Sequence, residues 1–482
     1  MAHHVFASHW LAPGATRGLT LKQRRKLLSL TAASGVAANL EVAVQAAGCE
    51  PTFEVVAAAA ASGQLSSRQW LSAHRCPFSG RPGLFDTALS AAARAGHQHV
   101  CEWLGTLGLI WQPCHVERAI ELAARGGHLG LADWVMRRYG PSAWVTPIDA
   151  RMATVFGAAR GCDLAALQRR FLQGGWGTRA PDTKRQALVN AAGSLTPDWA
   201  AKMEWLEAQG APRNDVCVAA EAAALPDDAG ALARLTWLQG RGYTVDGRAA
   251  ESAARAGNKA ALHYLIGEVS VQHERPHRYA SVAALRGHQA VLQALVNGGW
   301  PVKEREVFRC LARGGHMSAL AWLAGALGEG TVAELLRDRR LFAAAAGSGS
   351  MELLAWLRER GCPWSKAAIT QAAGSGCLAA LELLVEQGCP LPVDGSPYTA
   401  ACRNGDLAAL QGLRRLGVPW GPVGKVALEV LRGATYDSNC SNDTDGSGDD
   451  PPNDSDDERG WDSGDVPVPV LRCLLEEGCP MD

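Results

Sequence analysis

The sequence has 482 residues, of which 47% are hydrophobic and 20% charged, and its formal net charge at pH 7 is −1. Only 6% of the residues are aromatic and alanine is abundant, which favours closely packed helices over a β-rich core. No run of about 18 uncharged apolar residues occurs, so a transmembrane helix is excluded, and the 14 cysteines form no C-x-x-C pair, as expected of buried thiols in a reducing compartment.

The first segment, residues 1–26, is basic. No Asp or Glu precedes Glu41, and the segment holds Arg17, Lys22, Arg24, Arg25 and Lys26. This composition is compatible with a transit peptide, a nuclear signal, or the basic first turn of an end-capping helix. We expect a cytoplasmic protein, with the nucleus or an organelle as the alternatives.

After this segment a glycine recurs at nearly regular intervals along the chain. The regular examples follow an alanine-rich stretch and precede an apolar pattern with helical spacing: Gly96, Gly127, Gly287, Gly315 and Gly405. Each unit is therefore predicted to be a short helix, a glycine turn, a longer helix and a closing glycine. One unit cannot bury its apolar face alone, so we expect fourteen units to stack into a solenoid over residues 27–436, with a last capping helix in residues 466–482.

A polar residue directly follows most of the turn glycines. Four of these residues are histidines: His97, His128, His288 and His316. We expect each to accept a hydrogen bond from the free N–H groups at the start of the second helix. Stacked helices lie about 8–10 Å apart, whereas metal–ligand bonds measure about 2 Å. Successive histidines therefore cannot share a metal, and no metal site is predicted.

One unit resembles an ankyrin repeat. In "SPYTAACRNGDLAALQGLRRLG", Ser396 to Thr399 and Ala401 stand at the places of the T-P-L-H-x-A signature, and Asn404, Gly405 and Asp406 at those of the usual turn. Most other units lack the tetrapeptide and are shorter than the ankyrin repeat of about 33 residues, so the projecting finger should be reduced to a turn. The resemblance implies an all-α, ankyrin-like helix-turn-helix solenoid of about 14 repeats with a concave binding face.

This resemblance favours a non-catalytic scaffold or adaptor that binds one or more protein partners on its concave face and turns. We expect a monomer without a cofactor and without a specific nucleic-acid ligand. Two alternatives remain open. Some repeat-bearing proteins are similar to relatives of sphingolipid phosphodiesterases, although no catalytic motif for such a hydrolase occurs here. Electrostatic binding to nucleic acid or anionic membrane is the other, because the chain outside residues 437–465 has a net charge of +9.

Residues 437–465 interrupt the last unit with eleven acidic residues and one arginine. We predict a disordered acidic insertion between two helices, which either folds over the basic solenoid or is simply solvated. Ser455 precedes three acidic residues and is a candidate phosphorylation site.

Three tryptophans directly follow or come shortly after a closing glycine. Trp300, Trp364 and Trp420 are expected either to fold onto the helix ends or to remain exposed as anchors for a partner. No phosphate-binding loop, nucleophile elbow or dinucleotide fingerprint occurs. We therefore predict no catalytic residue.

Overall fold

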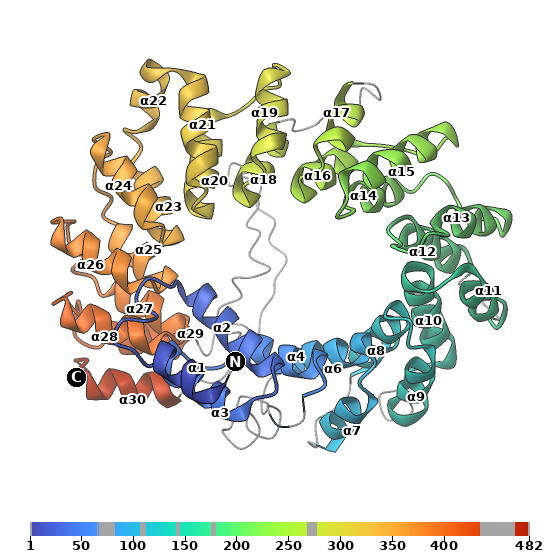
Figure 1. The fold of residues 1–482 in the computed structure, drawn as a ribbon, viewed down its shortest axis with the longest axis horizontal. Coiled ribbons are helices and arrows are strands. Elements are labelled where there is room, and N and C mark those ends of the chain that lie inside the picture. The colour runs from blue at the N-terminus through green and yellow to red at the C-terminus, as the bar shows by residue number, and fades with distance from the viewer. Residues whose placement is uncertain are drawn as a thin grey trace.

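The computed structural model describes residues 2–64, 66, 82–106, 112–140, 145–174, 180–267, 277–433 and 468–480. Within these ranges the regular structure is entirely helical, and the helices follow one another in pairs (Figure 1). The first helices of the pairs are α2 (Leu21–Ala33), α4 (Phe53–Ala61), α6 (Pro82–Ala95), α8 (Pro113–Arg125), α10 (Pro147–Gly161), α12 (Ala180–Ala192), α14 (Val216–Ala223), α16 (Gly247–Ala256), α18 (His277–Arg286), α20 (Glu304–Gly314), α23 (Arg339–Ser348), α25 (Ala368–Ser375), α27 (Ser396–Arg403) and α29 (Lys425–Gly433).

The second helices are α3 (Ala37–Ala47), α7 (Gln98–Thr106), α9 (Leu129–Tyr139), α11 (Leu164–Leu172), α13 (Trp199–Ala208), α15 (Asp228–Gly240), α17 (Lys259–Gly267), α19 (Gln289–Asn297), α21 (Met317–Leu327), α24 (Met351–Glu359), α26 (Leu378–Glu386), α28 (Leu407–Arg415) and α30 (Val468–Glu476). In the described ranges no second helix is paired with α4, and two helices stand outside the pairs, α1 (His3–Trp10) and α22 (Glu329–Leu335). The predicted helical-repeat solenoid is confirmed at this level.

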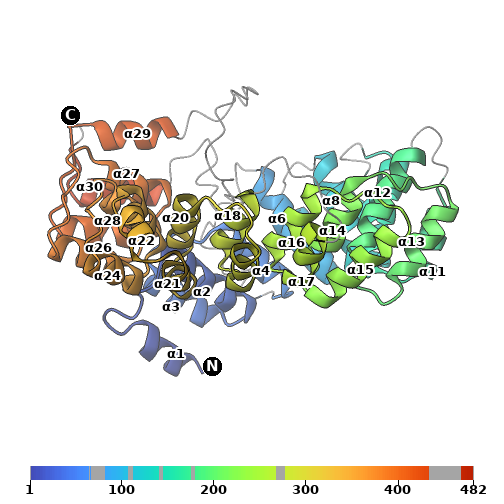
Figure 2. The same ribbon diagram turned by 90° about the horizontal axis from the view of Figure 1, so that it is seen from above.

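The helix pairs curve into a closed ring. Figure 1 shows the first helices on the inner side of the ring and the second helices on its outer side, and Figure 2 shows that the ring is flat compared with its width. The ring closes where the N-terminal pair meets the pairs α25/α26 and α27/α28. Two backbone hydrogen bonds join them there: Ala379 N–H donates to Arg17 O at 3.0 Å, and Ala408 N–H donates to Gly48 O at 2.9 Å.

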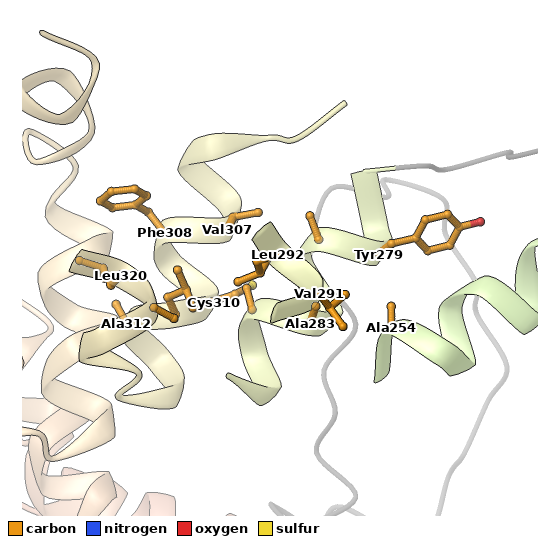
Figure 3. Close-up of a cluster of buried hydrophobic side chains, with 14 of the residues drawn as sticks. Ala254, Tyr279, Ala283, Val291, Leu292, Val307, Phe308, Cys310, Ala312 and Leu320 are labelled. Atoms are coloured by element: carbon orange, nitrogen blue, oxygen red, sulfur yellow. The ribbon is translucent and has the colours of Figure 1, made fainter. Parts of the chain in front are cut away.

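Small side chains allow the first helices to approach one another closely. In α18 and α20, for example, Ala283 and Ala312 are fully buried between neighbouring units, next to larger residues such as Leu292, Val307 and Phe308 (Figure 3). Alanine in a helix costs little side-chain entropy and leaves room for the next helix. The core therefore passes from one unit to the next, as expected of a solenoid, and forms two large clusters that meet within α10, one from Phe6 to Ala153 and one from Val155 to Cys479.

The turn glycines have left-handed backbone conformations. Their φ angles are 82° for Gly96, 85° for Gly127, 74° for Gly287, 69° for Gly315 and 62° for Gly405. At Gly287 a second constraint acts, because a Cβ atom there would lie 2.5 Å from Nδ1 of His316 in the next unit. Only glycine satisfies both the backbone conformation and this contact.

One boundary expected from the sequence falls inside a helix, and the predicted insertion is not tested by the structure. The division between residues 26 and 27 falls inside α2, because the basic residues belong to the first turns of a helix that continues to Ala33. The acidic insertion at 437–465 and Ser455 lie outside the described residues, between α29 and α30. Among the helices of the described ranges, none is long and apolar enough to cross a membrane.

Candidate functional site: the glycine turns and the arginine row

The turns between first and second helices stack on one another through polar side chains. Nε2 of His288 lies 2.9 Å from Arg255 O, and Nε2 of His316 lies 3.0 Å from Leu285 O. Both carbonyl groups are in the last turn of the preceding unit's first helix, where the helix itself supplies no donor. Each histidine therefore links its unit to the unit before it.

This geometry differs from the capping role expected for the histidines. The side chains of His128, His288 and His316 stand at the N-cap position but make no hydrogen bond to an N–H group of the following helix. His97 likewise directs Nε2 to Ala61 O of the preceding unit, at 3.0 Å. The imidazole is long enough to reach across the turn glycine of the neighbouring unit, which a short side chain such as serine is not.

Other residues make the same link where histidine is absent. Nδ2 of Asn258 donates to Ala223 O at 2.8 Å, and Sγ of Cys162 donates to Ala124 O at 3.2 Å. In the less regular middle units the donor comes from the second helix instead. Lys202 Nζ donates to Ala159 O at 3.1 Å and Arg234 donates to Ala192 O at 2.6 Å.

These two cations are buried. Burial lowers the pKa of the Lys202 ammonium, and it lowers the pKa of the Arg234 guanidinium to about 10. The carbonyl groups at a helix end carry partial negative charge, which suits a cationic donor at this position. The helix-end carbonyls are thus bonded in irregular as well as regular units.

An arginine stands one or two residues before many of the turn glycines. We call this set the arginine row: Arg94, Arg125, Arg160, Arg255, Arg286, Arg313 and Arg403. All seven are in the last turn of a first helix or at its end, and the first helices form the inner side of the ring (Figure 1). Arg94, Arg125 and Arg160 belong to three consecutive units, and so do Arg255, Arg286 and Arg313.

The row is electropositive where its members are adjacent. Burial, followed by repulsion from Arg160 and Arg94, lowers the pKa of Arg125. Arg160 forms an ion pair with Glu221. In contrast, Arg94, Arg125 and Arg313 form no ion pair with a carboxylate of the described ranges. Arg255 also forms an ion pair, with Glu251 at 2.8 Å. The guanidinium groups that are free to bind an anion are therefore those of Arg94, Arg125 and Arg313.

The row is not continuous: no arginine stands at this position in α2, α4, α12 or α14, and two further gaps lie at turns where the ring closes. Ser348 and Ser375 replace the arginine before Gly349 and Gly376. Residues 16–25, which we call the clasp segment, pass over these turns. A Cβ atom at Gly349 would lie 2.7 Å from the methyl group of Thr20, and one at Gly376 would lie 2.6 Å from a guanidinium nitrogen of Arg24. The small serines leave the space that the clasp segment occupies.

Arg24 is the centre of this closure. It is 1% exposed and donates to Oδ1 of Asp406 at 3.0 Å, to Ala47 O at 2.5 Å and to Gly376 O at 2.9 Å. Asp406 is fully buried and also accepts from Ala409 N–H at the start of α28. Arg24 thus bonds a helix-end carbonyl, as the histidines do elsewhere, and joins residues far apart in the sequence.

The clasp segment has two further polar contacts. Arg25 donates to Asn404 O at 2.6 Å, and Arg17 forms an ion pair with Glu382. These basic residues were evident in the sequence, but their partners were not. Asp406 was an indication in the sequence of one such partner. It occupies the position of a turn histidine, and its carboxylate is the natural partner of an arginine.

The three tryptophans considered as partner anchors pack within the chain. Trp364 lies edge-on against Phe342, with ring centroids 5.1 Å apart, and beneath the guanidinium of Arg358. Trp420 stacks on Tyr398 with ring centroids 3.7 Å apart. Trp300 is half-buried against the core. Of the two expectations for these rings, packing on the helix ends is the arrangement observed.

Comparisons with known proteins find a repeat architecture and no sequence family. No model of a known protein family matches the chain, and no curated protein matches it. Solved structures that match include the pentatricopeptide repeat protein PPR10 in complex with an 18-nt psaJ RNA element, at 11% identity and a TM-score of 0.28, covering 89% of this chain and 76% of that one. PPR10 from maize matches at 12% identity and a TM-score of 0.23, covering 85% and 70%.

These findings correct the ankyrin assignment. The matching structures named above are pentatricopeptide repeat proteins, and no family model, ankyrin or other, matches the chain. The adaptor function inferred from the ankyrin resemblance, with a protein partner and no specific nucleic acid, is therefore wrong, and so is the sphingolipid phosphodiesterase alternative. At these TM-scores the path of the superhelix differs, so the ligands of the matched proteins are not transferred to this chain.

Proposed function

We propose that the chain is a non-catalytic ring that binds a single-stranded nucleic acid along its arginine row. The observation that supports this most directly is that an arginine recurs at one position in two sets of three consecutive units, and that Arg94, Arg125 and Arg313 among them form no ion pair with a carboxylate of the described ranges. A guanidinium group presents paired donors that match the oxygens of a phosphate. The polar side chains of the turns are engaged with helix ends and do not converge on a reaction centre.

The spacing of the row suits a flexible polyanion. Stacked helices lie about 8–10 Å apart, so neighbouring arginines contact phosphates one or two nucleotides apart on an extended strand. The first helices that carry the row curve with the ring (Figure 1). A duplex has a persistence length of about 150 bp and resists such curvature, whereas a single strand follows it freely.

The test is a fluorescence anisotropy titration of a labelled single-stranded oligonucleotide at several salt concentrations. The triple variant Arg94→Ala, Arg125→Ala, Arg313→Ala should bind more weakly. Its slope of log affinity against log salt should be smaller by about 2, because each lost phosphate contact on a single strand contributes about 0.7. The wild-type protein should prefer the single strand to a duplex of the same length.

A matched control removes the same charge from second helices. The variant Arg137→Ala, Arg169→Ala, Arg415→Ala changes three exposed arginines outside the row and should keep the wild-type slope. Equal losses in the two triple variants would refute the assignment to the row. Binding of polyglutamate as tight as that of the oligonucleotide would show instead that the row binds an acidic polypeptide.

A further inference from the structure

We infer that the clasp segment is a reversible gate, through which a nucleic-acid strand enters the ring and is then enclosed by it. This inference rests on the proposed function, because it concerns how the strand reaches the arginine row. The row is on the first helices, which form the inner side of the ring (Figure 1). A strand held along several units of the row then lies within the closed ring, and a strand without free ends reaches it only through an opening.

The contact through which the clasp segment closes the ring, which we call the joint, differs from the contacts between units that are consecutive along the chain. Elsewhere consecutive first helices pack side by side through continuous apolar surfaces such as that of Figure 3. At the joint the contact consists of residues 16–25 and Gly48 against three turns and the start of α28. The joint is therefore the place where the ring can open without disrupting the stacked core.

The joint is also built from groups that separate as a unit. Arg24 and Asp406 meet across the joint, and the two backbone hydrogen bonds that accompany them join Arg17 to Ala379 and Gly48 to Ala408. On opening, all of these groups become accessible to water, which can replace their hydrogen bonds. Because stability in a solenoid is a sum over units and their interfaces, the units on both sides stay folded.

A single substitution allows the joint to be locked. Sγ of Cys377 lies 3.7 Å from Gly18 O, and a Cβ atom at Gly18 would meet no heavy atom within 4 Å. We therefore expect Gly18→Cys to form a disulfide with the native Cys377 when the folded protein is oxidised with diamide. Peptide mapping under non-reducing conditions identifies the bond, and Thr20→Cys, beside the same cysteine across Gly349, is the second variant.

The experiment loads the reduced variant onto a circular single-stranded DNA, and onto the same DNA cut once, at low salt. The complexes are then oxidised and washed at about 1 M salt, which screens the electrostatic contacts. The locked ring should remain on the circle and leave the linear DNA. The Gly18→Ser variant, which cannot be locked, should leave both.

The outcomes separate the two proposals. Release of the locked ring from circle and linear DNA alike would overturn the gate, because the strand would then lie outside the ring. Loading onto the circle by a ring that is locked beforehand, at the wild-type rate, would overturn it as well. Absence of binding to both DNAs at low salt would refute the proposed function itself.

Discussion

Side chains bond the carbonyl groups at helix ends both at the closure of the ring and at the turns between consecutive units, which we call open turns. The chemistry of the donor differs between the two places. At the open turns, His288 and His316 bond the helix-end carbonyl of the unit before them. At the closure, Arg24 bonds Gly376 O and is neutralised by Asp406. A histidine side chain makes the link between units adjacent in sequence, whereas a buried ion pair makes it between units at opposite ends of the chain.

This difference shows how a repeat array specifies where it closes. Every helix end presents the same carbonyl groups, so carbonyl recognition alone does not distinguish one turn from another. The turn before α28 is distinguished by Asp406, which only a cation can match once buried. The small side chains of Ser348 and Ser375 leave space for the clasp segment at the neighbouring turns. Register at the joint therefore depends on one charge pair and two small residues.

The largest expected effect comes from breaking that pair. In Arg24→Met, Asp406 remains buried without a counterion, a change that costs about 3–5 kcal/mol when a buried pair loses one partner. We expect the loss to be confined to the closure, with faster hydrogen exchange in α2 and α3 and an increased radius of gyration in small-angle scattering.

A double-mutant cycle isolates the pair from other effects of the substitution. Asp406→Asn keeps an acceptor for the N–H groups of α28 and removes the charge. The double variant Arg24→Met, Asp406→Asn should be more stable than Arg24→Met alone, because no uncompensated charge is left in the core. Additive losses would show that the two side chains act independently, contrary to the contacts observed.

The second prediction uses a cysteine at the closure as a reporter. Burial raises the pKa of the Cys377 thiol, and it raises that of Cys362 to about 12. At pH 8 both are protonated and inaccessible in the closed ring, so both should react slowly with N-ethylmaleimide. Arg24→Met should accelerate labelling of Cys377 at least about tenfold, since both exposure and a normal pKa favour the thiolate.

Cys362 is the internal control for this measurement, because it is fully buried away from the joint. Mass spectrometry of the labelled peptides follows both residues in one sample. Equal acceleration at both positions would indicate general unfolding and not an opening of the ring.

The third prediction concerns an open turn. Gly287→Ala should destabilise the protein by more than the roughly 1–2 kcal/mol that a left-handed conformation costs an L-residue, because the added Cβ also displaces the ring of His316. Gly299 is a matched control with a similar φ of 69° and no heavy atom within 4 Å of the added Cβ. Urea unfolding should therefore show a larger loss for Gly287→Ala, and equal losses would rule out the contact with His316 as a constraint.

The smallest effect is expected at the histidine itself. His316→Ala removes the hydrogen bond to Leu285 O and should cost about 0.5–1.5 kcal/mol. His316→Asn should recover much of this loss, because Asn258 makes the equivalent link in its own unit. If asparagine and alanine are equally destabilising in thermal unfolding, the link contributes little at this turn.

Periodicity made the helix pairs predictable, because helical spacing and glycine turns are local properties of the chain. The turn glycines lie where their spacing placed them, with positive φ angles. The direction of the histidines was not predictable in the same way. An N-cap bond and a bond to the neighbouring unit use the same sequence position, and only the packing of two units decides between them.

The family and function were misjudged for a related reason. A turn motif around Gly405 is short and follows from the needs of any helix pair joined by a left-handed residue. The motif therefore indicated a helical repeat, but it did not distinguish one family of helical repeats from another. The arginine row was present in the same stretches, yet its continuity depends on the stacking of turns that are one whole repeat apart in the sequence.

By itself, then, the sequence determined the class of the fold: an all-helical array in which alanines permit close packing and glycines reverse the chain. Tertiary structure alone decided that the array closes into a ring, that Arg24 meets Asp406 across it, and which arginines of the row are left without a carboxylate partner in the described ranges. The physical reason is separation along the chain. Local preferences act within one unit, whereas closure and continuity depend on the small rotation between units, summed around the whole ring.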